Sequence, residues 1–283
     1  MKVHISADME GCTGIADPRD VLKEEDDYPI GKTLMVGDVN AAIEGALDAG
    51  ADEITVNDSH WTMTNLEQPE LRDEARLIRG STKRRLMVQG LTSNHDVTFF
   101  VGYHGKAGTP GAVLNHTLFP QMLVELRVND IEVGELGYNA GFAWDHDVPV
   151  GLVTGDDKTA EEAYSVLGEN QVETAIVKEG IDRFTANSLP EPKARKRIRD
   201  AACVAVERAS DNEFDQGPYD TPVSIEVDWS ATNHAYHASH LDGVERVGGR
   251  TTRVVKDTYS DAYDSSLAMI MAASAAHNRM FTW

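Results

Sequence analysis

The chain has 283 residues, of which 41% are hydrophobic and 26% charged, so it can bury one large core or two moderate ones without disulfides. Its 47 acidic and 26 basic side chains give a formal charge of −21, which argues against nucleic acid and anionic membranes as partners, because both attract basic surfaces. No stretch approaches the roughly 18 apolar residues of a membrane span. The N-terminal residues lack the features of a secretory signal, and the chain has only two cysteines, Cys12 and Cys203. We therefore expect a cytoplasmic protein without disulfides.

The first two-thirds of the sequence alternate between strand and helix patterns. Strands are predicted at 3–7, 53–57, 97–102, 148–153 and 174–177, and helices at 34–49, 135–144 and 159–167. Residues 123–128 and 131–134 flank Asn129-Asp130, a pair typical of a two-residue β-hairpin. Because strands separated by helices usually pair in parallel, the sequence predicts an α/β fold with a mainly parallel sheet flanked by helices.

The composition changes near residues 188–192, where two prolines mark a linker or the edge of a subdomain. A helix is predicted at 193–209, a strand at 223–227 and a helix at 265–276. We therefore expect residues 1–190 to form the larger α/β domain and residues 191–283 a smaller C-terminal α+β lobe.

The acidic excess is rich in aspartate, and lysine is scarce, with 26 Asp against 10 Lys. Two interpretations remain open: an ordinary acidic cytosolic protein, or one adapted to high salt, in which hydrated carboxylates maintain solubility. Thermal stability that does not change between low and molar KCl would exclude the second.

Three of the predicted strands end in residue types that bind metals. Asp8 and Glu10 follow the first strand, His60 follows the second and His104 follows the third. In a parallel sheet, ligands bind outside the carboxyl ends of the strands, so these side chains are expected at one edge. Two imidazoles with two carboxylates suit zinc or a similar metal better than magnesium or calcium. The alternative to a metal site is that these side chains are ordinary polar residues, because acidic residues near strand ends are common in so acidic a chain.

The segment Ser6-Ala7-Asp8-Met9-Glu10-Gly11 matches the S-x-D-x-E-G signature of a known family. The chain resembles the zinc-dependent, DppA-like D-aminopeptidases along almost its whole length, although the resemblance weakens after about residue 190. The further matching segments are 56–60, 102–104, 109–111 with His116, 133–137 with Asn139, 147–150 and 155–157.

The resemblance implies a binuclear zinc site, with two ions per chain, in the catalytic domain at 1–190. The implied ligands are Asp8 (bridging both ions), Glu10, His60, His104 and Glu135, and His116 falls at the catalytic position. The resemblance also implies a homodecamer with its active sites facing an internal chamber. The implied activity is hydrolysis of the N-terminal amide bond of short peptides with a free N-terminus, releasing D-amino acids such as D-Ala.

These residue types fit the implied chemistry. A carboxylate between two cations offsets their repulsion, and the pair lowers the pKa of a water toward neutrality, which supplies a hydroxide nucleophile. His116, with an ordinary pKa near 6.5, suits stabilisation of the oxyanion or protonation of the leaving amine.

Several alternatives remain open. The protein could be a related metal-dependent amidohydrolase acting on L-peptides or non-peptide amides, or a non-catalytic, metal-dependent peptide-binding ring protein. Cys12 could be a nucleophile with a nearby histidine as its base, or simply a small packing residue. His234, His237 and His240, at i, i+3 and i+6, could hold a second metal or line a polar helix face.

Overall fold

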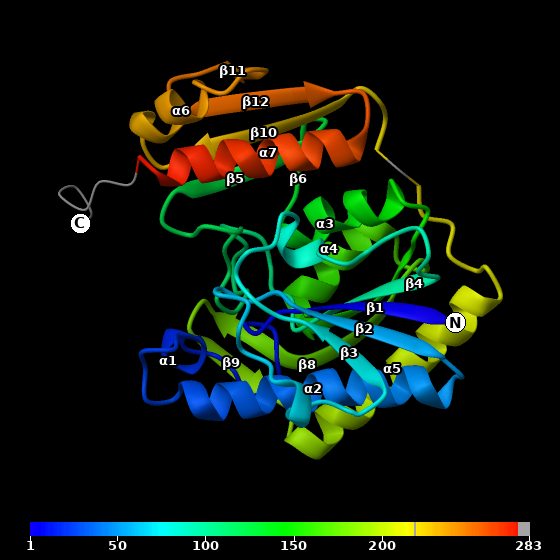
Figure 1. Cartoon of the computed structure of the whole chain (residues 1–283). Coiled ribbons are helices and arrows are strands. Elements are labelled where there is room, and N and C mark those ends of the chain that lie inside the picture. Colours follow the sequence, from blue (N-terminus) through cyan, green and yellow to red (C-terminus); the bar gives the residue numbers. More distant parts are fainter. Residues whose placement is uncertain (218, 277–283) are drawn as a thin grey trace.

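In the computed structural model, which describes residues 1–217 and 219–276, seven strands form a mostly parallel sheet (Figure 1). They are β1 (Lys2–Ala7), β2 (Glu53–Asp58), β3 (Ala75–Ile78), β4 (Val97–Val101), β7 (Val150–Asp156), β8 (Glu173–Asp182) and β9 (Thr185–Ser188). The spatial order is β3-β2-β1-β4-β7-β8-β9, and only the last pair, β8 with β9, is antiparallel. The central strands β4 and β7 are buried at every residue, as expected for parallel strands covered on both faces.

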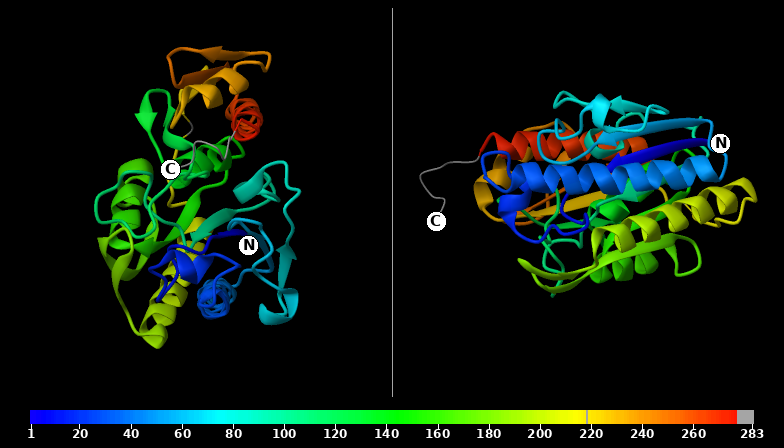
Figure 2. Two further views of the ribbon diagram at one scale, coloured as in Figure 1. Left: turned by 90° about the vertical axis from the view of Figure 1, so that its left-hand side faces the viewer. Right: turned by 90° about the horizontal axis from the view of Figure 1, so that it is seen from below.

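Helices cover both faces of this sheet. One face carries α2 and α5, which pack side by side, and the opposite face carries α3 and α4 (Figures 1 and 2). The α-helices are α1 (Pro18–Val21), α2 (Tyr28–Asp48), α3 (Glu135–Trp144), α4 (Asp157–Leu167), α5 (Glu191–Ser210), α6 (Thr232–Ala238) and α7 (Tyr259–Ser274). Two short 3-10 helices, η1 (Gln68–Glu70) and η2 (Leu86–Val88), lie in the connections.

A second, antiparallel sheet of five strands lies on the side of α3 and α4 (Figure 1). Its strands, in spatial order, are β11 (Val244–Arg246), β12 (Thr251–Lys256), β10 (Val223–Trp229), β5 (Leu123–Val128) and β6 (Ile131–Glu132). Burial alternates along β10, as is typical of a sheet with one covered face. Helix α7 covers this sheet and also contacts α3, so it joins the two parts of the fold.

The predicted fold class, a mainly parallel α/β sheet with a smaller C-terminal lobe, is confirmed. The predicted hairpin is also confirmed, and positive φ angles at Asn129 (47°) and Asp130 (66°) form its turn. The division at residue 190 stays a prediction, and the two sheets do not follow it along the chain. The β5–β6 hairpin joins the second sheet, whereas α5 packs against the parallel sheet.

None of the helices in the described residues has both the length and the hydropathy that a membrane crossing requires.

Candidate metal centre

The three loops that carry the sequence-predicted ligands begin at the same level of the parallel sheet. Ala7, the last residue of β1, lies opposite Asp58 on one side and Val101 on the other. Because β1 is paired in parallel with both β2 and β4, its carboxyl end meets theirs at one edge. Asp8, His60 and His104, which follow those ends, are therefore brought together.

Asp8 lies between the two histidines. Its Oδ1 is 3.4 Å from His60 Nδ1, and its Oδ2 is 3.5 Å from His104 Nε2. Glu10 Oε2 lies 2.9 Å from the same His60 nitrogen. The carboxylate of Asp8 thus has one oxygen toward each imidazole, as a bridging ligand requires.

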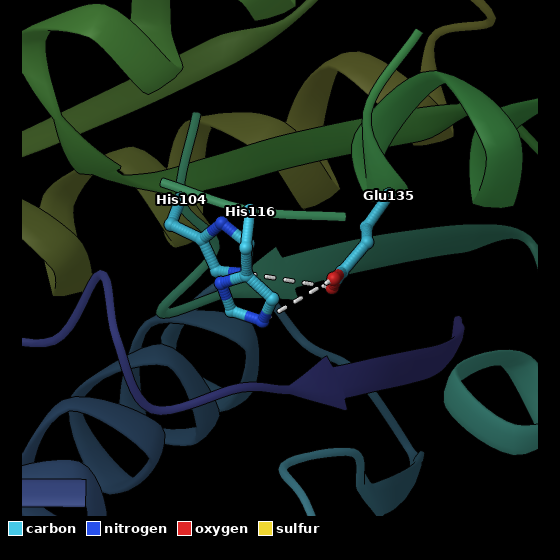
Figure 3. A group of neighbouring side chains, drawn as sticks. All are labelled: His104, His116 and Glu135. Atoms are coloured by element: carbon cyan, nitrogen blue, oxygen red, sulfur yellow. Dashed lines mark ion pairs between the residues drawn. The ribbon is translucent and has the colours of Figure 1, made fainter. Parts of the chain in front are cut away.

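Glu135 and His116 complete the cluster from two further elements (Figure 3). Glu135 is the first residue of α3, and its Oε2 lies 3.5 Å from His104 Nε2. His116 comes from the long loop between β4 and β5, and its Nε2 is 3.8 Å from Glu135 Oε1. The rings of His104 and His116 stack with centroids 4.1 Å apart. Six residues therefore converge as two groups: Asp8, Glu10 and His60 in the first, and His104, His116 and Glu135 in the second.

Each of the three histidines uses one ring nitrogen to bind a main-chain carbonyl. His60 Nε2 donates to Val21 O (3.0 Å), His104 Nδ1 to Gly105 O (3.1 Å) and His116 Nδ1 to Leu114 O (2.8 Å). The other ring nitrogen of each then faces the carboxylates with its lone pair when the ring is neutral. Metal-binding histidines typically show this division of roles, because the carbonyl fixes the tautomer and the ring orientation.

The charges of the cluster depend on one another. Burial lowers the pKa of His60, but Glu10 and Asp8 outweigh it, so that this pKa is raised well above its ordinary value. Burial likewise opposes charge on His104, and Glu135 raises its pKa. Burial and the neighbouring Glu10 raise the pKa of Asp8 to about 7. Histidine binds a metal only when it is neutral, so protons and a metal cation compete for the ring nitrogens of His60 and His104. Acidification is therefore expected to weaken metal binding.

The donors fit a zinc centre. Asp8 Oδ2 is buried and has no hydrogen-bond partner among the residues that the structure describes, which is costly for a carboxylate oxygen unless a cation or another donor occupies the adjacent space. Zinc binds imidazole nitrogens together with carboxylate oxygens, whereas magnesium and calcium take oxygen ligands. The residues that the sequence predicted as ligands therefore form a chemically suitable set.

Comparisons with known proteins identify the family of the chain. A family model described as D-aminopeptidase matches residues 1–268. The chain belongs to this D-aminopeptidase family. It is 34% identical over 281 residues to a D-aminopeptidase of Bacillus subtilis (strain 168), covering 99% of this chain and 100% of the relative. The solved structure of the Zn-dependent D-aminopeptidase DppA from Bacillus subtilis, described as a self-compartmentalizing protease, matches with a TM-score of 0.91 and 32% identity. That match covers 97% of this chain and 98% of the other.

In this D-aminopeptidase family member, one buried lysine supports the loop that carries Glu10. Lys178 of β8 donates from Nζ to the main-chain oxygens of Glu10 (2.6 Å), Cys12 (2.8 Å) and Ile15 (2.6 Å). All three ammonium hydrogens are thereby used, so the lysine can be buried with its charge. Sequence reasoning missed this residue, because a lysine within a strand carries no signal that a loop folds over it.

Cys12 does not suit the role of a nucleophile. Its thiol is fully buried and lies 3.3 Å from the main-chain oxygen of Asp8. Burial, followed by the charge of Asp38, raises the pKa of Cys12 well above its ordinary value, so the reactive thiolate is disfavoured. The interpretation as a packing residue is the one that the structure favours.

We expect a maleimide reagent to modify Cys203 in the native protein and Cys12 only after denaturation, because Cys203 is partly exposed and Cys12 is buried. Mass spectrometry of the labelled chain measures this directly. The Cys12→Ala variant should keep its hydrolytic activity, whereas loss of activity with an intact metal content would restore the thiol hypothesis.

The three histidines at 234–240 do not form a comparable group. His234 is buried and donates from Nδ1 to Ala273 O (3.0 Å), while His237 and His240 are exposed, with ring centroids 5.9 Å apart. Within residues 1–217 and 219–276, the converging groups of potential ligands are the two at the sheet edge. The structure therefore favours the interpretation without a second metal: His237 of α6 and His240, just beyond it, are exposed polar residues, whereas His234 faces the interior.

Proposed function

We propose that this chain is a zinc-dependent D-aminopeptidase that binds two zinc ions. Its substrates are short peptides with a free N-terminus, usually a D-residue such as D-Ala, and it hydrolyses their first amide bond. The proposed ligands are Asp8, Glu10, His60, His104 and Glu135, with His116 as the catalytic residue. We place the enzyme in the cytoplasm, where thiols stay reduced, because both of its cysteines are free.

The observation that carries this proposal is the position of Asp8 between His60 of the first ligand group and His104 of the second. Each of its oxygens faces a different histidine, at 3.4 and 3.5 Å, and a second carboxylate stands beside each histidine. When bound, a pair of zinc ions would polarise the scissile carbonyl and lower the pKa of a water.

The protein's own residues account for the rest of the proposed chemistry. His116 Nδ1 is held by Leu114 O, which leaves Nε2 to hold or deliver a proton beside Glu135. Burial and the neighbouring His104 lower the pKa of His116, which makes its protonated form a better acid toward a leaving amine. The five proposed ligands are buried, which limits the access of bulk water to the reacting groups.

We also propose that the chain assembles into a homodecamer that encloses its active sites. The support for this part is the self-compartmentalizing nature of the matched Bacillus subtilis DppA. The mass of the native assembly in solution, measured by light scattering, tests it: a mass close to that of one or two chains would contradict it.

The test of function is hydrolysis of D-Ala-p-nitroanilide beside its L-isomer, with and without a chelator and with zinc added back. We expect D-selective turnover that the chelator abolishes and zinc restores. Turnover of the L-isomer alone would favour the amidohydrolase alternative. Absence of turnover of either isomer by protein shown to contain zinc would favour another amide substrate or the non-catalytic ring protein.

A further inference from the structure

One carboxylate outside the ligand set joins the two main-chain segments that carry His104 and Glu135. Glu162 lies on α4, and its two oxygens accept from different backbone donors. Oε2 accepts from Lys106 N at 2.8 Å, and Oε1 accepts from Gly134 N at 3.1 Å. Neither donor belongs to the same element as Glu162, so this side chain links three parts of the chain.

Both donors lie within two residues of proposed ligands. Lys106 stands two residues after His104, and Gly134 directly precedes Glu135 at the N-terminus of α3. The contact is also tight, since a Cβ added at residue 134 would lie 2.6 Å from Glu162 Oε1 and 2.7 Å from Lys106 Cβ. The position of Glu162 therefore sets how closely the His104 segment approaches the start of α3.

The first ligand group is supported by different residues. Lys178 holds the main chain at Glu10, and Asp58 accepts from Asn65 N (2.6 Å) in the loop after His60. The two main-chain hydrogen bonds of Glu162 go instead to Lys106 and Gly134, which lie beside the second ligand group.

We infer that Glu162 is a positioning residue for one metal only, the ion held by His104 and Glu135. This inference rests on the proposed binuclear zinc site. By fixing the distance between these two ligands, Glu162 sets the affinity of the second site, while the site of Asp8, Glu10 and His60 keeps its own. Groups that orient metal ligands in this way typically change metal affinity by about 10- to 100-fold when they are altered.

The Glu162→Gln variant isolates this role, because it keeps the shape of the side chain. Both carboxylate oxygens accept from N–H groups, so a glutamine amide must place its NH₂ against one of them. The matched control is Glu161→Gln on the same helix, since Glu161 is exposed and pairs with Lys158.

The experiment is a zinc titration of the metal-free full-length protein against a chromophoric chelator, repeated with cobalt to record the absorption of each site. Wild type and Glu161→Gln should bind two ions with the same two affinities. Glu162→Gln should keep one affinity and lose about 10- to 100-fold in the other, and the corresponding cobalt band should change.

A second variant acts on the same contact from the other side. Gly134→Ala places a methyl group against Glu162 Oε1, at a backbone φ of −90° that alanine tolerates. This variant should also lower the affinity for the ion held by His104 and Glu135. It therefore decides the question if Glu162→Gln does not fold.

The outcomes separate the inference from the function on which it rests. Two unchanged zinc affinities in Glu162→Gln would overturn the inference, and so would an equal loss at both sites with a lower thermal midpoint of the metal-free protein. Wild-type protein that binds no zinc would instead refute the binuclear site itself.

Discussion

The His60→Ala variant is expected to lose at least one of two zinc ions per chain and to hydrolyse peptides at least about a thousandfold more slowly. The imidazole lies 2.9 Å from Glu10 and 3.4 Å from Asp8, so its removal leaves two buried carboxylates without the nitrogen donor that completes their group. Loss of an activating metal costs several kcal/mol of transition-state stabilisation, and each 1.4 kcal/mol is about tenfold in rate.

Metal content measured by plasma emission spectrometry, together with the hydrolysis rate, checks this expectation. His237→Ala provides the matched control, since His237 is an exposed histidine of α6, outside the cluster. Wild-type metal content in both His60→Ala and His104→Ala would refute the ligand assignment.

The His116→Ala variant should behave differently, with kcat lower by about 10²- to 10⁴-fold and both zinc ions retained. His116 has the most exposed side chain of the six, at 16%, and its Nε2 is 3.8 Å from the nearest carboxylate oxygen, farther than in the other pairs. These features are typical of a group that contacts the substrate, and they are less suited to a metal ligand.

Steady-state kinetics with a zinc assay on the same preparation separates the possible outcomes. Unchanged turnover would contradict the catalytic role of His116. Loss of one zinc ion together with activity would instead make it a ligand of the second group, in which its ring already stands beside His104 and Glu135.

The parallel sheet could be predicted because its central strands are short, continuous apolar runs separated by helical patterns. The same rule placed Asp8, His60 and His104 at one edge, since each lies within three residues of the end of such a strand. Glu135 and His116 were proposed only from the resemblance. One begins a helix and the other lies in a loop, and the local sequence pattern there does not indicate that either residue lies near the strand ends.

Other features depend on contacts between distant residues and were not predictable from local pattern. The β5–β6 hairpin was recognised, but its membership of the second sheet depends on pairing with β10, as in Val128 opposite Ile225. The edge strands β3 and β9 were missed, because each has only four residues. Lys178 and Glu162 resemble ordinary surface residues until the loops that cover them are in place.

The low exposure of the ligands has a consequence for the shape of an acceptable substrate. The five proposed metal ligands are between 3 and 5% exposed, whereas the side chain of His116 is 16% exposed, so little of the cluster reaches the surface of the subunit. A chain end needs room for backbone mainly on one side of the cleaved bond, whereas an internal segment would need room on both sides. Burial of the ligands would therefore disfavour loops and folded domains as substrates of each subunit, even before any enclosing assembly adds a second barrier.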